Sequence, residues 1–578
     1  MVQDIYDPLS EYADVFRDRF EKVAEKTFAQ LAREAQVDAD ANRETCRQIY
    51  TTQQQTDSLS STIVWWTLLC VVMWLAVAGG VVYMCFRPSQ QALTASVGLA
   101  VAALVAAGLI LLLWQIHPRL HALKEKRGQL ETLTAQLKDE AWKQMAPLNQ
   151  LYDWDVLTRM MSETVPRLEF DPYFTTQRLA DLKMVYHWDD AFNAERSVIY
   201  SHSGLINGNP FVICRTRKME WGQKLYTGSM TIHWTTEEPD ADGKYHTVHH
   251  TEVLTANVTA PYPEYHEKTR LIYGNTAAPD LVFNRKQSGM ADREGTLSYK
   301  WKAHALRRKA RDLSNSDFAM MSNEDFEVAF NTSDRNNNQQ FALLFTPLAQ
   351  ESMMKLLKDH TVGYGDDFDF LKNRMINTIV PQHMQSIDLD MNPRQYQNFD
   401  YDKAQKDFYA INANYFRAIY FSLAPLLCVP MYQQIRSQQD IYGHDMQRES
   451  AFWEHEALAN FWGEARFKHP QCVTPCILKT SQSKQRGDTS TIEVVAHGYR
   501  TASRVTYVSV LGGDGRTHEV PVFWDEYLPV TGVGYIDMME DNADDSAESQ
   551  TQRLQHISEV LHQSNLNTYR RHIASKVQ

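Results

Sequence analysis

Two long runs without a charged residue lie close together near the N-terminus, and they restrict the fold more than any other feature. The first covers residues 62–86 and the second covers residues 93–115, about 25 and 23 residues. A helix needs about 20 apolar residues to cross the hydrocarbon core of a bilayer. The sequence therefore predicts a transmembrane unit at 62–115, and the few residues between the runs allow only a tight hairpin.

The charges around these runs predict how the hairpin is oriented. Arg43 and Arg47 precede the first run, and the short connection carries only Arg87. Four basic residues follow the second run, at Arg119, Lys124, Lys126 and Arg127. Because Lys and Arg next to membrane helices favour the cytoplasmic side, we expect a multi-pass protein of the cell membrane with both termini in the cytoplasm.

Apolar residues at helical spacing flank the hairpin on both sides. Residues 1–61 contain an amphipathic stripe from Leu9 to Leu31, with Asp7-Pro8 as its predicted cap and first position. In residues 116–155, leucines recur every seven positions, at Leu123, Leu130 and Leu137, a spacing typical of coiled coils. We expect an antiparallel helical stalk; the alternative is that both stripes pack on the globular domain.

Residues 156–535 change to a mixed pattern that predicts a β-rich α+β domain. Short β-branched and aromatic runs predict strands; they lie at 197–201, 211–216, 230–235, 245–258, 492–495, 504–511 and 518–524. Glycines 512, 513 and 515 predict a hairpin turn between the last two. Residues 302–358 read as helical, with Thr346-Pro347 starting one helix. Residues 536–578 read as an acidic linker and a C-terminal helix.

Residues 415–432 form the other strongly apolar stretch of the chain. After Arg417 the uncharged run lasts only about 15 residues, which is short for a straight membrane helix. Pro425 and Pro430 each remove a backbone donor. The stretch therefore predicts a helix buried in the globular domain rather than a third span, with contact to the membrane surface as the alternative.

Charge and cysteine usage exclude two broad classes. The net charge is −13 and the pI is about 5.9, so no basic field of the kind that binds nucleic acid is expected. The seven cysteines are scattered, and two lie inside the predicted spans. This pattern is not that of a disulfide framework.

The motif Thr361–Asp366 reads Thr-Val-Gly-Tyr-Gly-Asp, in the same letters as the selectivity filter of potassium channels. A filter lies between two spanning helices, whereas this motif lies far beyond the hairpin and follows charged residues. The spacing therefore predicts a glycine-rich turn. Asp366, Asp367 and Asp369 could together hold a cation, but acids in a polar loop are usually solvated, and no metal is predicted here.

Histidine and cysteine groups give weak candidates for zinc. His469 with Cys472 and Cys476 lacks a fourth ligand in a compact pair. In a second group, the strand period places His246 and His250 on one face and His249 on the other. His455-Glu456 has no second histidine at the spacing of a zinc helix, and no nucleophile elbow or phosphate loop is present. No metal or cofactor is predicted, and catalytic residues remain unknown.

Several short segments carry a resemblance to a known group of proteins. They are Ser203-Gly204 with 207–211, Tyr226-Thr227-Gly228, Phe326-Glu327-Val328 and 345–348. With the hairpin, these segments resemble bacterial membrane proteins of unknown function that carry two transmembrane helices and a large cytoplasmic α+β domain. The resemblance implies a bacterial membrane setting and no particular activity.

Two hypotheses for function follow from the sequence. The first is a membrane-anchored binding or scaffold protein, with the bilayer and a protein partner or a second copy as its contacts. The second is a membrane-anchored, hydrolase-like enzyme, because triads assemble in space and need not appear as a sequence motif.

Overall fold

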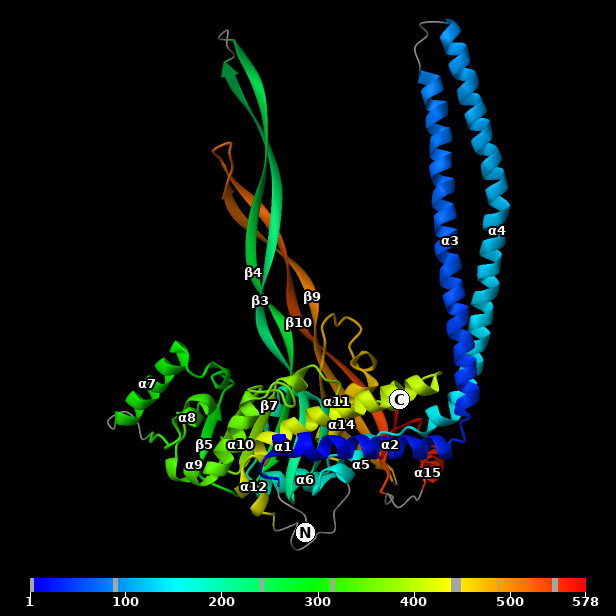
Figure 1. The fold of residues 1–578 in the computed structure, drawn as a ribbon. Helices are drawn as coiled ribbons and strands as arrows, with labels where there is room; N and C mark the ends of the chain where they lie inside the picture. Colours follow the sequence, from blue (N-terminus) through cyan, green and yellow to red (C-terminus); the bar gives the residue numbers. More distant parts are fainter. Residues whose placement is uncertain are drawn as a thin grey trace. The chain divides into compact units, whose positions relative to one another are not determined.

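The computed structural model describes residues 5–86, 92–239, 244–312, 318–437, 449–486, 488–542 and 549–578, without the side chains at 77, 80–86, 92–106, 109, 113 and 486. The fold is α+β, as predicted, and it contains two antiparallel sheets (Figure 1). The chain divides into two compact units. Unit 1 comprises Met1–Lys26, Asp153–Asn392 and Ile411–Gln578, and unit 2 comprises Thr27–Tyr152 and Pro393–Ala410.

Two long helices, α3 (Ala39–Phe86) and α4 (Ala92–Leu151), dominate unit 2. Among the described residues, one helical segment, Ala39–Ala76, is long and apolar enough to cross a membrane. Its large apolar side chains are exposed, with Trp65 at 62% and Leu75 at 67%, as expected for a helix whose solvent is lipid. Most side chains of the predicted second span at 93–115, and the connection at Arg87, lie outside the described residues.

Helices α3 and α4 lie side by side (Figure 1), and polar contacts join them near the start of α3. Asn42 donates to the Gln144 amide oxygen at 3.1 Å, and Gln144 donates to the Thr45 hydroxyl at 3.0 Å. Asn42 also donates to the carbonyl of Phe399, so the 393–410 segment packs into the same place. Interhelical amide contacts of this kind fix the register of two helices, because a shift by one residue would leave both amides unpaired.

The N-terminal stripe packs on a helix far away in the sequence. It is carried by α1 (Pro8–Glu11), a π-helical turn η1 (Tyr12–Phe16) and α2 (Arg17–Glu34), and the predicted start is confirmed, since Asp7 accepts from the Ser10 N–H. Phe20 stacks on Phe416 of α11 (Tyr401–Leu427), with ring centroids 4.3 Å apart. The first part of the stripe therefore packs within the globular unit, which was the alternative to the stalk.

The 415–432 stretch is buried, as predicted. Its side chains in α11 are nearly inaccessible, with Tyr420 and Leu423 each 1% exposed. Pro425 lies inside α11, and Pro430 is the first residue of the short helix α12 (Pro430–Gln434). Burial in unit 1 explains how the two prolines are tolerated, because neighbouring side chains can satisfy the carbonyls that they leave free.

The first sheet has the strand order β1-β2-β3-β4-β7-β6-β5 within the described residues. Its strands are β1 (Leu168–Phe170), β2 (Arg196–Ile206), β3 (Asn209–Pro239), β4 (Tyr245–Gly274), β5 (Val282–Arg285), β6 (Phe368–Asn373) and β7 (Ile376–Pro381). The predicted strands at 211–216, 230–235 and 245–258 are parts of β3 and β4, whose pairing runs unbroken from Phe211↔Tyr273 to Pro239↔Tyr245.

The second sheet has the order β11-β12-β10-β9-β8 within the described residues. Its strands are β8 (Ile477–Arg486), β9 (Thr489–Leu511), β10 (Thr517–Glu540), β11 (Thr568–Arg570) and β12 (Ile573–Val577). The structure differs here from the predicted boundary at 536, because β10 continues to Glu540. Ile536 and Met538 are fully buried on either side of the acidic Asp537, so acidic residues concealed a strand. Part of the acidic stretch, 543–548, lies outside the described residues.

The hairpins β3–β4 and β9–β10 extend beyond their sheets and pack face to face; we call these extensions the β-arm (Figure 1). Ile232 and Leu254 of one hairpin form a buried cluster with Val520 and Val522 of the other. Gly228 makes the closest approach, since a Cβ there would lie 2.2 Å from the Pro521 carbonyl oxygen. Each hairpin thus covers the apolar face of the other, which a lone two-stranded ribbon cannot do.

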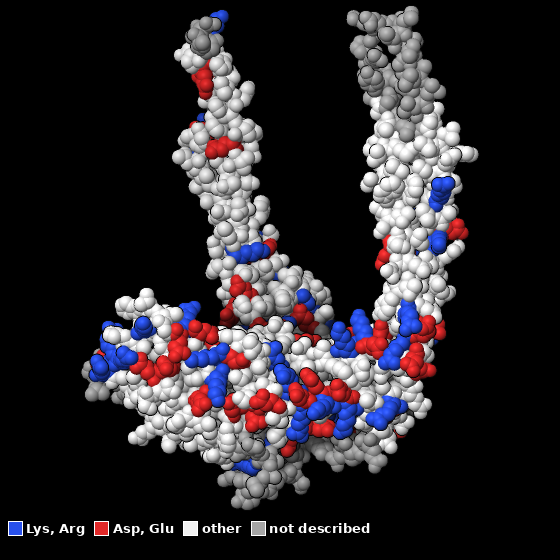
Figure 2. Space-filling model, viewed as in Figure 1, with Lys and Arg blue, Asp and Glu red and all other residues white. Residues whose placement is uncertain are grey.

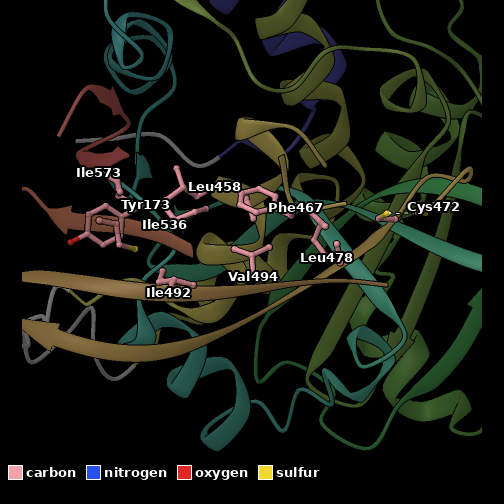
Figure 3. Packing of buried hydrophobic residues seen from close by; sticks show 13 residues of the cluster. Tyr173, Leu458, Phe467, Cys472, Leu478, Ile492, Val494, Ile536 and Ile573 are labelled. Atoms are coloured by element: carbon pink, nitrogen blue, oxygen red, sulfur yellow. Dashed lines mark hydrogen bonds between the residues drawn. The ribbon is translucent and has the colours of Figure 1, made fainter. Parts of the chain in front are cut away.

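The second sheet packs on α14 (Phe452–Trp462) to form one core of unit 1 (Figure 3). Leu458 of the helix lies among Leu478, Ile492 and Val494 of β8 and β9. Ile573 of β12 completes the cluster, so the last strand belongs to the core.

The remaining helices cover the sheets or link them. They are α5 (Val156–Thr164), α6 (Thr176–Met184), α7 (Leu297–Arg311), α8 (Glu324–Phe330), α9 (Asn338–Leu344), α10 (Pro347–Lys358), α15 (Gln550–Ser564) and the short turns η2 (Ala191–Asn193), η3 (Ala291–Arg293), η4 (His383–Gln385), η5 (Pro393–Tyr396) and η6 (Glu464–Arg466). The predicted start of α10 is confirmed, because the Thr346 hydroxyl accepts from the Ala349 N–H.

Candidate functional site

A cavity of about 320 Å³ lies on one face of the first sheet in unit 1. Small-molecule sites usually have volumes of about 300–1,000 Å³. The floor comes from β4, β7 and β6, where Ile272 and Leu371 both pair with Thr378 in the register. Directly paired residues point to the same face of a sheet, so these three side chains form one row under the cavity.

Aromatic side chains from the segment after α6 form one wall. Trp188 and Phe192 line the cavity, and both rings contact the buried Trp453 of α14, at 5.2 and 5.9 Å between centroids. Gly274 of β4 allows α6 to approach, since a Cβ there would lie 2.8 Å from the Tyr186 ring. The wall is therefore held by the packing of α6 and α14 on the sheet.

Two arginines line the cavity and meet at the same aromatic ring. The guanidinium carbon of Arg196 lies 5.0 Å from the Phe192 ring centroid, and that of Arg270 lies 5.6 Å from it. Arg270 donates to the Thr216 hydroxyl at 3.0 Å, and Arg196 donates to the Phe192 carbonyl. Within the described residues, neither guanidinium has a carboxylate partner.

The two positive charges are close enough to affect each other. Burial lowers the pKa of Arg270, and the charge of Arg196 lowers it further. The neighbouring Lys268 responds in the same way, because burial and then Arg270 lower its pKa. Asp189 also lines the cavity, where it accepts the Ala191 N–H at 2.9 Å. The arrangement is therefore positive and only partly neutralised, which favours an anionic ligand.

The Thr361–Asp366 motif forms a turn in unit 1, as predicted. Its carbonyls bind a cation of the chain itself, because Arg417 donates to the oxygens of Val362 at 2.8 Å and Gly363 at 2.9 Å. The Arg417 guanidinium also lies 4.5 Å from the Tyr364 ring centroid. The turn is thus held onto α11 by one arginine.

The three acids of this loop go to three different partners. Asp366 pairs with the fully buried Arg285, His383 lies 2.5 Å from Asp367, and Lys286 lies 2.8 Å from Asp369. The carboxylates are therefore not turned toward a common point.

The histidine and cysteine candidates for zinc do not form a complete set of ligands. The Cys472 and Cys476 sulfur atoms lie 3.7 Å apart, whereas His469 accepts from the Gln471 N–H. His250 stacks on Trp234 at 5.1 Å in the β-arm. Among the described residues, no group of three or more His, Cys, Asp or Glu side chains could hold a metal ion.

His455 contacts a serine in a way that does not resemble a nucleophile and its base. The Ser450 hydroxyl lies 2.9 Å from His455 Nε2, but it donates to Glu540 at 2.7 Å. A nucleophilic serine must instead give its proton to the imidazole. The hydroxyl therefore has its hydrogen engaged elsewhere.

Buried charges also form a cluster around Glu454, which is 0% exposed. Arg570 and Arg571 lie 3.3 and 2.7 Å from the same carboxylate oxygen. The cavity beside Arg571 has a volume of only about 20 Å³, room for about one water molecule. This cluster therefore joins α14 to β11 and the turn before β12 and offers no ligand site.

The sequence did not single out Arg196 or Arg270. One weak signal was present, since Arg270 lies two positions before the apolar Ile272 and therefore on the same face of its strand. The convergence with Arg196 depends on the strand order and cannot be read along the chain. A scan against models of protein families and searches of curated proteins and of solved structures found no match to this chain.

Proposed function

We propose that the protein is a membrane-anchored binding protein. In this proposal, residues 62–86 and 93–115 form a transmembrane hairpin with both termini in the cytoplasm, and unit 1 carries the binding site. The apolar, exposed segment Ala39–Ala76 supports the anchor. The basic residues after the second run support the orientation.

The ligand that fits the cavity is a small anion with a flat, apolar body. One observation supports this choice. The guanidiniums of Arg196 and Arg270 meet at the Phe192 ring in a cavity of about 320 Å³, and neither has a carboxylate partner among the described residues. Arginine binds carboxylate and phosphate groups through its planar set of donors. Trp188, Ile272 and Leu371 would cover the apolar body.

Binding fits the site better than catalysis. The described lining residues include His187, Asp189 and Thr378 but no serine or cysteine, the common nucleophiles of acyl-transfer hydrolases. The scaffold role expected from the sequence is compatible with this site, because a bound anion could control how unit 1 binds a protein partner.

The proposal is tested by titrating the full-length protein in detergent with aryl and alkyl carboxylates and phosphates, each beside its neutral amide or alcohol. We expect the anions to bind and the neutral analogues to bind far more weakly. Arg196→Gln and Arg270→Gln should each weaken binding by about 10- to 100-fold, the usual loss for a charged hydrogen bond. Arg516→Gln, in the turn of the β9–β10 hairpin, is the matched control.

Equal affinity for an anion and its neutral analogue would contradict the proposal. Unchanged affinity in both arginine variants would contradict it as well.

A further inference from the structure

Helix α7 (Leu297–Arg311) is strongly basic on a chain of negative net charge. Its 15 residues include six Lys or Arg and no Asp or Glu. One side of the helix is part of unit 1, since Tyr299, Ala303 and Leu306 are buried against Phe318 and Val328. The fold therefore fixes which side of α7 faces outward.

The outward side carries two large apolar residues. Leu297 is 75% exposed and Trp301, one turn further on, is 74% exposed. Ala305 continues the same row and is also exposed. Full burial of a side chain such as leucine is favourable by about 1.5–3 kcal/mol. This row of exposed apolar residues is therefore suited to contact an apolar phase.

Three cations beside this row have no ion-pair partner among the residues that the structure describes: Lys300, Arg308 and Arg311. Other cations of the helix are engaged, because Arg307 pairs with Glu324 at 2.6 Å and Lys309 donates to the Ser333 carbonyl at 2.5 Å. Figure 2 shows Lys and Arg gathered over the position of α7.

The acids just before the N-terminus of α7 are neutralised by other residues. Glu294, just before the helix, pairs with Lys358 at 2.6 Å, and Asp292 lies 2.9 Å from His360. The positive charge of the outward side is therefore not cancelled at its N-terminal end.

We propose that the outward side of α7 docks on the surface of an anionic lipid bilayer. Helices that lie in the membrane interface combine Trp and Leu with flanking Lys and Arg. Anionic headgroups attract such cations, and the indole ring prefers the headgroup level. The proposal is separate from the cavity and its ligand, and it uses only the attachment of the chain to a membrane.

The test uses the full chain in lipid nanodiscs, made either of phosphatidylcholine alone or of phosphatidylcholine with phosphatidylserine. Hydrogen exchange of the α7 amides is followed by mass spectrometry. We expect exchange up to about a hundredfold slower with phosphatidylserine, the factor that three cations near an anionic surface supply together. Exchange in α14 should be equal in both lipids. About 1 M salt, where the Debye length falls to about 3 Å, should remove the difference.

Two variants separate the contributions. Changing Lys300, Arg308 and Arg311 together to Gln should remove the effect of phosphatidylserine, and Leu297→Ser with Trp301→Ser should reduce it. The matched control changes Lys468, Arg500 and Arg516 to Gln, three cations that also lack an ion pair in the described part of the chain. It should behave like the unchanged protein.

Equal exchange of α7 in the two lipids would overturn the proposal. Equal loss of protection in the control variant would overturn it too, because the effect would then follow net charge alone. Slow exchange of α7 already in detergent would show that another part of the chain or a protein covers this face, against the lipid assignment.

Discussion

At the scale of single residues, unit 1 relies on charges that are removed from water. Glu454 accepts from the Ser201 hydroxyl at 3.0 Å, in addition to its contacts with Arg570 and Arg571. A buried ion is stable only when its partners remain, because an unpaired buried charge loses its solvation without compensation.

The first prediction concerns this carboxylate. Glu454→Gln should destabilise α14 and β12 by about 3–5 kcal/mol, because the buried Arg571 guanidinium loses its anion, whereas Arg570 keeps Asp390 at 2.7 Å. Hydrogen exchange of the α14 amides measures the change. The control, Glu526→Gln, removes a partly exposed pair with Arg504 and should cost about 1 kcal/mol or less. Equal effects of the two changes would contradict the role given to burial.

The second prediction concerns Lys372, which is 1% exposed. Its ammonium donates to the carbonyls of Ala277 at 3.0 Å and Arg374 at 2.6 Å, and burial lowers its pKa to about 7. In the unfolded chain the pKa of lysine is about 10.4. Between pH 7 and 10 the unfolded state therefore binds more protons, so the stability of the fold rises with pH in this window and is lowest below pH 7.

Lys372→Met should remove this rise. The stability of the unchanged protein relative to the variant should increase by up to about 4 kcal/mol from pH 7 to pH 10, measured by hydrogen exchange or by thermal unfolding in detergent. Lys468→Met, with a partly exposed lysine, should show no such change. A constant difference across this pH range would show that the fold does not lower the pKa of Lys372, against the prediction.

At the scale of elements, the β-arm depends on close approach between two hairpins. Its core is narrow, because each hairpin contributes one face. Gly228 faces the backbone of Pro521 and Val522, with 2.2 Å to the carbonyl oxygen from a built Cβ. A side chain at this point meets main chain, which cannot move aside without shifting the strand.

Gly228→Ala should therefore separate the hairpins locally. We expect a loss of about 1–3 kcal/mol, seen as faster hydrogen exchange around Ile232 and Val522 with unchanged exchange in α14. Ser229→Ala, at the adjacent outward position, is the control and should have little effect. Unchanged exchange in both variants would mean that the hairpins do not pack tightly at Gly228.

The sequence predicted the kinds of elements better than their lengths. Caps at Asp7 and Thr346 were found because a capping side chain followed by a proline is a signal that local sequence carries. The strands predicted at 211–216 and 230–235 are parts of one longer strand, β3. Gly228 lies between them, where it allows the other hairpin to approach. The cavity was missed because its two arginines come together only through the strand order β2-β3-β4, which no local pattern encodes.

At the scale of the whole molecule, the segment Ala39–Ala76, which is long and apolar enough to cross a membrane, belongs to unit 2. Unit 1 contains both sheets and the cavity. Thr52 of α3 and Thr134 of α4 are each 8% exposed, and both lie outside the apolar runs. A deletion that begins after Thr52 and ends before Thr134 removes the predicted spans. It leaves Asn42 and Gln144, which contact each other, in the chain.

Replacing residues 58–128 by a short Gly-Ser linker should release the protein into the soluble fraction as a single species. The unchanged protein should remain in the membrane after carbonate washing, because a helix that crosses the bilayer is not extracted. Membrane association of the shortened variant that resists carbonate would contradict the anchor. Association that is lost in high salt would fit surface docking by α7.

The packing of the N-terminal helix on α11 has a consequence for how the chain is made. The Tyr420 hydroxyl donates to the Pro8 carbonyl across 412 positions of sequence. At a synthesis rate of about 5–20 residues per second, the aromatic stripe with Tyr12 and Phe20 waits roughly 20–80 s for its partner to leave the ribosome. During that time the apolar runs of the predicted hairpin are synthesised as well. The emerging chain therefore carries uncovered aromatic surface while it is directed to the membrane, a period in which chaperones would have to act.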